Sequence, residues 1–357
     1  MSKLRWVGLG LGVLAVCLLA GAQSGSDRPG GYHVGQSVTL PGGGGWDYLG
    51  IDVPGRRIYV SASTEEDVVN ADTFQVVGKV EGLKGTHGVA ISGKDGHGFT
   101  SNGGGNSMTE FDLKTLATIK EIPLPIQRPD GIIYDPATDR VFAFNHDSKA
   151  VAVDAKTGEV AGTVDLPSKA SEYAVADGRG HVYNNMEDSS VEIEIDAKTL
   201  KITHQWPLAP CEGPSGLAMD TQTRRLFIGC HNGMMAMMNA DTGAIVATVP
   251  IGPGVDANRF DEGTKLAFSS NGGGTGTITV AHEDSPGKLT LVGNIPTEAG
   301  ARTMELDPKT HTLFTVTAKF EPAPPRPAGE AAPAGRGRGP RRQMVAGSFH
   351  LLVIPNH

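Results

Sequence analysis

The chain repeats one polar-to-apolar pattern every 40 to 46 residues. Each repeat opens with a polar residue and a short apolar alternation, as in "RPDGIIYD" and "ARTMELD". A run with a central aromatic follows, as in "DRVFAFNH" and "HTLFTVTA", and a polar turn with a threonine then separates two β-rich runs, as in "VDAKTGEVAGTV". A repeat of this length is typical of a four-stranded propeller blade. The pattern therefore predicts four short strands in each repeat.

Seven polar residues open the repeats, and this number sets the predicted architecture. They are Asp47, His87, Asp130, Glu172, Ser215, Asp256 and Arg302. We therefore predict an all-β chain that forms a seven-bladed β-propeller of four-stranded blades. The last repeat supplies only three strands, and the N-terminal segment from Tyr32 to Gly42 resembles a fourth. If this segment paired as the fourth strand of the last blade, it would close the ring and leave no unpaired sheet edge.

The first 22 residues predict the compartment. Lys3 and Arg5 precede an apolar run at 7–19, and "AGA" at 20–22 is a small-residue cleavage site. This pattern indicates a secretory signal peptide at 1–22, with the propeller at 23–357. We therefore expect a periplasmic or secreted protein with no membrane span after cleavage. The net charge of −8 argues against a partner bound through a nucleic-acid backbone.

Cys211 and Cys230 are the two cysteines of the predicted mature chain. An even cysteine count in an exported chain predicts a disulfide. Counting back through the hairpin turn at 221–224 places Cys230 opposite Ser215, with Cys211 in the loop at that same end. The bond is therefore within reach.

A Pro/Gly/Arg-rich stretch at 321–343 interrupts the last repeat. It has no periodicity and almost no bulky apolar residue, so it predicts a disordered loop within the last blade. Arg336, Arg338, Arg341 and Arg342 make the stretch locally basic. Contact with an acidic partner or with phosphate-rich envelope material is therefore an alternative to a solvated insertion.

The repeats "DAKTGEVAGTVDL", "NADTGAIVATVPIG" and "DPKTHTLF" resemble those of the YVTN-repeat β-propellers, and within them the bacterial exported YncE-like group. The resemblance covers residues 32–355. It implies the propeller fold and export, but no single activity, because propellers host many functions. Some seven-bladed relatives in the wider superfamily are lactonases and lyases. The chain has no Cys-x-x-Cys-His motif for haem attachment.

Repeats of a propeller are related by rotation about the central channel, so the seven opening residues are expected on one ring at a channel mouth. Three asparagines that end second strands, Asn102, Asn145 and Asn271, are expected near the same face. A wet channel satisfied by water is one interpretation. The other is a ligand site in which crowded carboxylates attract a cation.

The predicted metal ligands are Asp130, Glu172 and Asp256, and oxygen ligands favour a hard divalent cation such as calcium. Arg302 could instead neutralise the acids or bind a ligand carboxylate. His87 is the candidate general base because imidazole titrates near neutral pH.

We predict a monomer that binds a small molecule, a cation or an envelope protein at this mouth, rather than an enzyme. A lactonase- or lyase-type enzyme that uses a metal and His87 stays open as an alternative, as does a scaffold for an envelope redox complex.

Overall fold

The computed structural model describes residues 28–43, 45–322 and 343–356. The predicted signal peptide at 1–22 and positions 323–342 of the predicted loop lie outside these ranges. Within them, no helix has the length and apolar character that crossing a membrane would require. The one helix among the described residues is a short 3-10 turn, η1 (Pro29–Gly31).

The described chain is all-β, as predicted, and its strands form five four-stranded sheets and one seven-stranded sheet. The seven-stranded sheet contains β2 (Leu49–Asp52), β3 (Arg57–Ser61), β4 (Ser63–Asn70), β5 (Val76–Ser92), β6 (His97–Asn102), β7 (Ser107–Asp112) and β8 (Thr118–Pro123). The next two sheets along the chain are β9 (Pro129–Asp135), β10 (Arg140–Asn145), β11 (Lys149–Asp154) and β12 (Val160–Asp165), and then β13 (Ser171–Ala176), β14 (His181–Met186), β15 (Val191–Asp196) and β16 (Lys201–Pro207).

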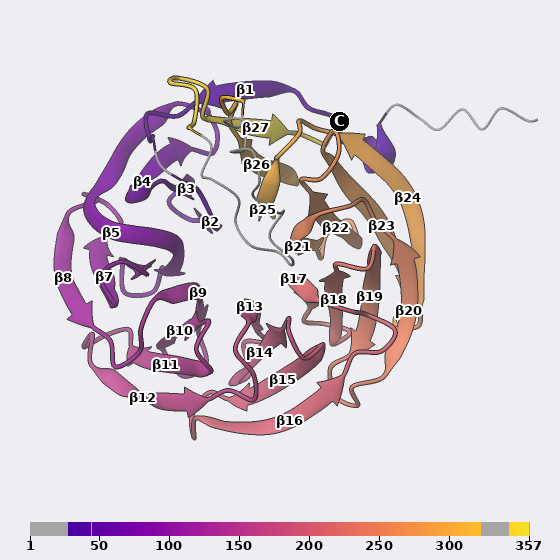
Figure 1. Cartoon of the computed structure of the whole chain (residues 1–357), viewed down its shortest axis with the longest axis horizontal. Coiled ribbons are helices and arrows are strands. Elements are labelled where there is room, and N and C mark those ends of the chain that lie inside the picture. Colours follow the sequence, from indigo (N-terminus) through magenta and orange to yellow (C-terminus); the bar gives the residue numbers. More distant parts are fainter. Residues whose placement is uncertain (1–27, 44, 323–342, 357) are drawn as a thin grey trace, which may run out of the picture.

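The remaining sheets complete the strand order. They are β17 (Pro214–Asp220), β18 (Arg225–Cys230), β19 (Met234–Asn239) and β20 (Ile245–Pro250), then β21 (Val255–Asp261), β22 (Leu266–Asn271), β23 (Thr277–Ser285) and β24 (Lys288–Pro296), and last β25 (Arg302–Asp307), β26 (Thr312–Thr317) and β27 (His350–Ile354) with β1 (Gln36–Thr39). The sheets surround a central channel, with strands such as β9, β13 and β17 innermost and β12, β16 and β20 on the outer rim (Figure 1). This arrangement is a β-propeller.

The N-terminal strand β1 is shorter than predicted and pairs with the C-terminal strand β27. The antiparallel register runs from Gln36 opposite Val353 to Thr39 opposite His350. Tyr32 forms an isolated bridge with Asn356 just before this strand. The first and last parts of the described chain therefore share one sheet (Figure 1).

The aromatic that recurs in each second strand explains why the repeats pack as blades. These aromatics are completely buried: Tyr59, Phe99, Phe142, Tyr183, Phe227, Phe268 and Phe314. Each large ring removes apolar surface from water between neighbouring sheets, which is the main favourable contribution to packing.

A β-bulge lies at the start of most of the innermost strands. In β9, β13, β17, β21 and β25, two residues stand opposite one residue of the second strand, and β5 has one extra residue at His87. Bulges re-aim side chains and are common next to functional sites. The bulge corrects one sequence prediction, because Cys230 stands opposite Pro214 and not opposite Ser215.

The disulfide prediction is confirmed. Cys211 and Cys230 are bonded, with their Cα atoms 5.5 Å apart. Both residues are buried, and the bond ties the loop before β17 to the end of β18.

Candidate functional site at the channel mouth

Most of the seven predicted ring residues lie at one mouth of the channel. The ion-pair partners among them, Asp47, His87, Asp130, Glu172, Asp256 and Arg302, have side chains 20 to 40% exposed. Five of these six lie inside or directly before a bulge of an inner strand, where the chain leaves regular pairing, and Asp47 precedes β2. Ser215 differs because it is buried, and its hydroxyl donates to the backbone oxygen of Asp256 at 3.1 Å.

Three of these side chains form a compact cluster. One potential ligand atom from each of Asp47, His87 and Asp130 lies within 4.8 Å of the others. His87 Nδ1 is 2.8 Å from Asp47 Oδ2 and 3.3 Å from Asp130 Oδ1. Because an ionised carboxylate can only accept, Nδ1 carries the proton in this arrangement and donates it toward the acids. The cluster includes Asp130 of the three predicted metal ligands, but not Glu172 or Asp256.

His146 belongs to the mouth although the sequence interpretation did not include it. Its Nε2 lies 3.3 Å from Asp130 Oδ2 and 3.9 Å from Glu172 Oε1. His146 follows β10 directly, in the turn to β11. His231 follows β18 in the same way and lies 3.2 Å from Glu187. The repeat comparison would have found this second set one residue beyond each second strand.

Arg302 partly neutralises the other side of the mouth. Its Nη1 lies 3.6 Å from Asp47 Oδ1 and 3.5 Å from Asp256 Oδ1. Its Nη2 donates to the backbone oxygen of Trp46 at 2.9 Å, and the guanidinium lies over the Trp46 ring. These contacts fix the guanidinium between two acids, so Asp47 is shared by the cationic side and the histidine cluster.

Burial, with repulsion from neighbouring acids, shifts two of the mouth acids, Asp47 and Glu172, toward their protonated forms. Desolvation is the main cause that raises the pKa of Asp47, opposed by the hydrogen bond with His87. Desolvation and the charge of Glu187 hold the pKa of Glu172 well above its usual range. The hydrogen bond with Asp130 raises the pKa of His146. A bound cation would offset the repulsion between the acids, which is the second contribution to the raised pKa values of Asp47 and Glu172 after desolvation.

The three strand-end asparagines are not brought into this cluster. They are at most 1% exposed, and their amide groups bond within the sheets. Asn102 donates to Thr109 at 2.9 Å, Asn271 to Thr279 at 3.0 Å, and Asn145 to the backbone oxygen of Gln127 at 2.8 Å. Their role in the structure is to join strands and loops.

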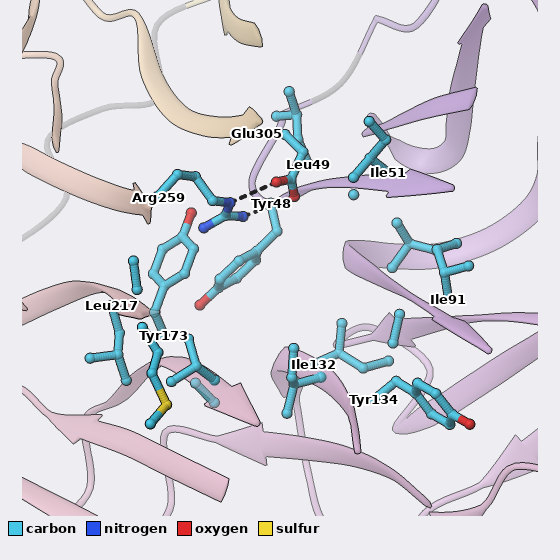
Figure 2. Close-up of a pocket in the computed structure, with 18 of the residues that line it drawn as sticks. Tyr48, Leu49, Ile51, Ile91, Ile132, Tyr134, Tyr173, Leu217, Arg259 and Glu305 are labelled. Carbon is cyan, nitrogen blue, oxygen red and sulfur yellow. Dashed lines mark hydrogen bonds and ion pairs between the residues drawn. The ribbon is translucent and has the colours of Figure 1, made fainter. Parts of the chain in front are cut away.

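Tyr48 and Tyr173 fill the channel just inside the mouth. Their ring centroids are 4.5 Å apart, and Tyr173 bonds Thr303 through its hydroxyl at 2.9 Å. Burial raises the pKa of both phenols well above the usual range, so both stay protonated. Figure 2 shows the two rings in contact, with the ion pair of Arg259 and Glu305 beside them.

A cavity of about 390 Å³ begins at these tyrosines and follows the channel inward. Its walls are mainly apolar side chains of the inner strands, among them Ile51, Ile91 and Ile132 (Figure 2). The charged mouth and this cavity are therefore separate parts of one channel.

Comparison with known proteins supports the fold. No protein-family model matches the chain, and no curated protein matches it in sequence. A chain from "Crystal Structure of Mitotic Checkpoint Complex" is 15% identical with a TM-score of 0.69, covering 88% of this chain and 96% of that one. "Structure of U3-55K" is 9% identical with a TM-score of 0.72, covering 92% and 99%. "Crystal structure of RRP9 WD40 repeats" is 10% identical with a TM-score of 0.72, covering 92% and 98%. At these identities the likeness shows a WD40-like β-propeller fold and nothing of function.

Proposed function

We propose that this propeller is an exported, monomeric binding protein that holds a divalent cation at the channel mouth. The observation that carries the proposal is the cluster of Asp47, His87 and Asp130, whose ligand atoms lie within 4.8 Å of one another. His146, 3.3 Å from Asp130, can add a further nitrogen ligand.

The charge balance at the mouth supports a cation rather than an anion directly on the cluster. Asp47 and Asp256 pair with the Arg302 guanidinium, whereas Asp130, Glu172 and Glu187 pair with histidines. Carboxylates brought this close raise each other's pKa unless a cation is present.

The donor set also favours one kind of cation. The sequence predicts oxygen ligands and calcium, whereas the structure adds imidazole nitrogen. Mixed imidazole and carboxylate ligands suit zinc, manganese or iron better than calcium, which takes oxygen donors. We therefore expect the mouth to prefer a transition metal ion over calcium.

Isothermal titration calorimetry with Mn²⁺, Zn²⁺ and Ca²⁺ tests the proposal. Asp130→Asn and His87→Ala are expected to weaken transition-metal binding at least ~10-fold, as the loss of a metal ligand does. Asp165→Asn is a matched control, because Asp165 is an exposed acid paired with Lys149 at 2.5 Å. Equal cation affinity in the wild type and in Asp130→Asn contradicts the proposal.

A metal-dependent lactonase or lyase is the second candidate. It is favoured by the contact of His87 with Asp47 at 2.8 Å, because a carboxylate that orients an imidazole is a common arrangement in general bases. Lactone hydrolysis that needs both a bound cation and His87 would support this candidate. A protein partner at the same face is the third candidate, and it rests on the fold similarity alone.

We also propose seven blades and membership of the YVTN-repeat group. The support is β5, a strand of 17 residues that pairs first with β4, at 76–86, and then with β6, at 86–92. Such a strand can be the outer strand of one blade and the inner strand of the next, which would divide the seven-stranded sheet in two. The pairing of β1 with β27 would then close the ring. Deleting residues through Gly42 should abolish cooperative unfolding, and an unchanged melt would contradict closure.

A further inference from the structure

A polar cavity of about 750 Å³ lies directly beside the proposed cation site. Two residues of the cluster, His87 and Asp130, line this cavity together with His146. Asn106, Gln127 and Arg128 line it as well, and the loop at Gly103 and Gly104 completes the lining. No bulky apolar side chain lines it, so its chemistry suits a hydrophilic ligand.

The glycine loop brings the backbone close to the cluster. A Cβ atom at Gly103 would lie 2.7 Å from His87 Nε2, and one at Gly104 would lie 2.8 Å from the backbone oxygen of Lys84. Larger residues would therefore displace the imidazole or the loop. The cavity and the position of His87 depend on glycine at these two positions.

Arg128 occupies a backbone position that other repeats give to glycine. It lies two residues before Asp130 and has a φ of 48°. Glycine stands two residues before five of the six other ring positions, and Ala170 is the exception. Four of these glycines, Gly85, Gly213, Gly254 and Gly300, have φ of 68°, 60°, 71° and 79°. A left-handed backbone costs energy for residues other than glycine. The Arg128 side chain therefore stands at a place where the backbone alone would favour glycine.

The Arg128 guanidinium is available to a ligand. Its backbone N–H donates to Asn106 Oδ1 at 2.8 Å, which fixes the loop. Within residues 28–43, 45–322 and 343–356 the guanidinium has no ion-pair partner, and the residue is exposed at the cavity wall. An unpaired guanidinium in the same cavity as a cation site is suited to an oxyanion, because its fork binds two oxygens of one group.

We infer that the cavity binds a small molecule carrying a carboxylate, which bridges Arg128 and the cation of the mouth. This inference rests on the proposed function, because the cation supplies the second positive group. Without it, the acids of the cluster would repel the anion. Phosphate is also an oxyanion that an arginine can bind. The experiment must therefore distinguish carboxylate compounds from phosphate compounds.

The test is a calorimetric titration of Mn²⁺-loaded protein with malonate, and in parallel with inorganic phosphate. Arg128→Gln keeps the length and removes the charge, and Arg128→Gly restores the residue of the other repeats. Both variants are expected to bind malonate at least ~10-fold more weakly, because a charge-assisted bidentate contact is lost. Their Mn²⁺ affinity should change less than ~2-fold, because Arg128 is not a ligand of the proposed cluster. Arg128→Gly should melt at the same or a higher temperature, which a purely structural role for the arginine does not predict.

Lys84→Gln is the matched control, because Lys84 is a nearby cation that pairs with Glu121 at 2.9 Å, and it does not line the cavity. If the wild type binds malonate more tightly than phosphate, the natural ligand is a carboxylate compound. If it binds phosphate more tightly, the site is assigned to phosphate compounds. Equal probe affinity in the wild type and Arg128→Gln overturns the inference while leaving cation binding intact. If the wild type takes up no Mn²⁺, the proposed function fails. In that case malonate is titrated into the metal-free wild type and the metal-free Arg128 variants. No malonate binding, or equal binding in the wild type and the variants, overturns the inference.

Discussion

The channel mouth and the channel interior are built from consecutive residues at the starts of the inner strands, yet their chemistry is opposite. At the mouth, Asp47, just before β2, and Glu172, in β13, are partly exposed acids that repel their neighbours. One residue further along the chain, Tyr48 and Tyr173 are buried rings in contact. A change at the mouth should therefore alter binding, and a change in the interior should alter stability.

The ion pair of the interior gives the largest expected stability effect. Arg259 Nε lies 2.8 Å from Glu305 Oε1, and the arginine also lies over the Tyr173 ring. Arg259→Met leaves Glu305 without its partner, which should cost about 3–5 kcal/mol of unfolding free energy in urea melts. The exposed pair of Lys94 and Asp139 is the control, where Lys94→Met should cost less than ~1 kcal/mol. Cation binding should survive in both variants, and its loss in Arg259→Met would break the separation of the two regions.

Glu66 tests the border between the regions, since it lies buried behind His87 and accepts a hydrogen bond from Thr86 at 2.6 Å. Desolvation raises its pKa from 4.5 to about 8. The folded state thus holds a proton that the unfolded state releases above about pH 4.5. The contribution of Glu66 to the free energy of unfolding is therefore fully present below about pH 4.5, and it is lost as the pH rises through 8.

Glu66→Gln should remove this loss of stability at high pH, because glutamine carries no proton that can be released. At pH 9 the variant should be more stable than the wild type by roughly 2–4 kcal/mol, and at pH 4 the two should be nearly equal. Urea melts at both pH values measure the difference. A stability difference between the two proteins that does not change with pH would show that Glu66 is not held in its neutral form.

Gly88 tests how tightly the tyrosines fill the channel. A Cβ atom at this position would lie 2.9 Å from Tyr48 Cβ and 3.2 Å from Tyr48 Cγ. Gly88→Ala should therefore cost about 1–3 kcal/mol by overpacking. Gly93→Ala, with nothing within 4 Å of the added atom, is the control and should have little effect. Equal melting temperatures for the two variants would mean that the tyrosines have room to move.

Asp256 should give the smallest effect on stability. Its Oδ1 lies 3.5 Å from the partly exposed Arg302, so the pair contributes little in water. Asp256→Asn should change unfolding free energy by less than ~0.5 kcal/mol. It should also weaken cation binding far less than Asp130→Asn does in the same calorimetric assay. If the two variants lose equal affinity, the cation lies nearer the channel axis than the cluster of Asp47, His87 and Asp130.

The repeat spacing predicted the meeting of Asp47, His87 and Asp130, because rotation places equivalent residues at one mouth. It did not predict the bulges, because they lie at the polar starts of the strands, where there is no apolar alternation that an extra residue would interrupt. The pairing of Cys230 was therefore wrong by one residue. The asparagines were expected at the mouth from strand ends alone. The threonines of the neighbouring strands, Thr109 and Thr279, bind two of them inside the sheets.

The most direct test of the account is a crystal structure of the mature protein grown with Mn²⁺ and measured for anomalous scattering. The account predicts one strong peak at the mouth, about 2.0–2.3 Å from carboxylate oxygens of Asp47 and Asp130 and from a nitrogen of His87. The same experiment on Asp130→Asn should show no peak there. Ordered water alone between these three side chains of the wild type would contradict the cation site and leave a wet channel mouth.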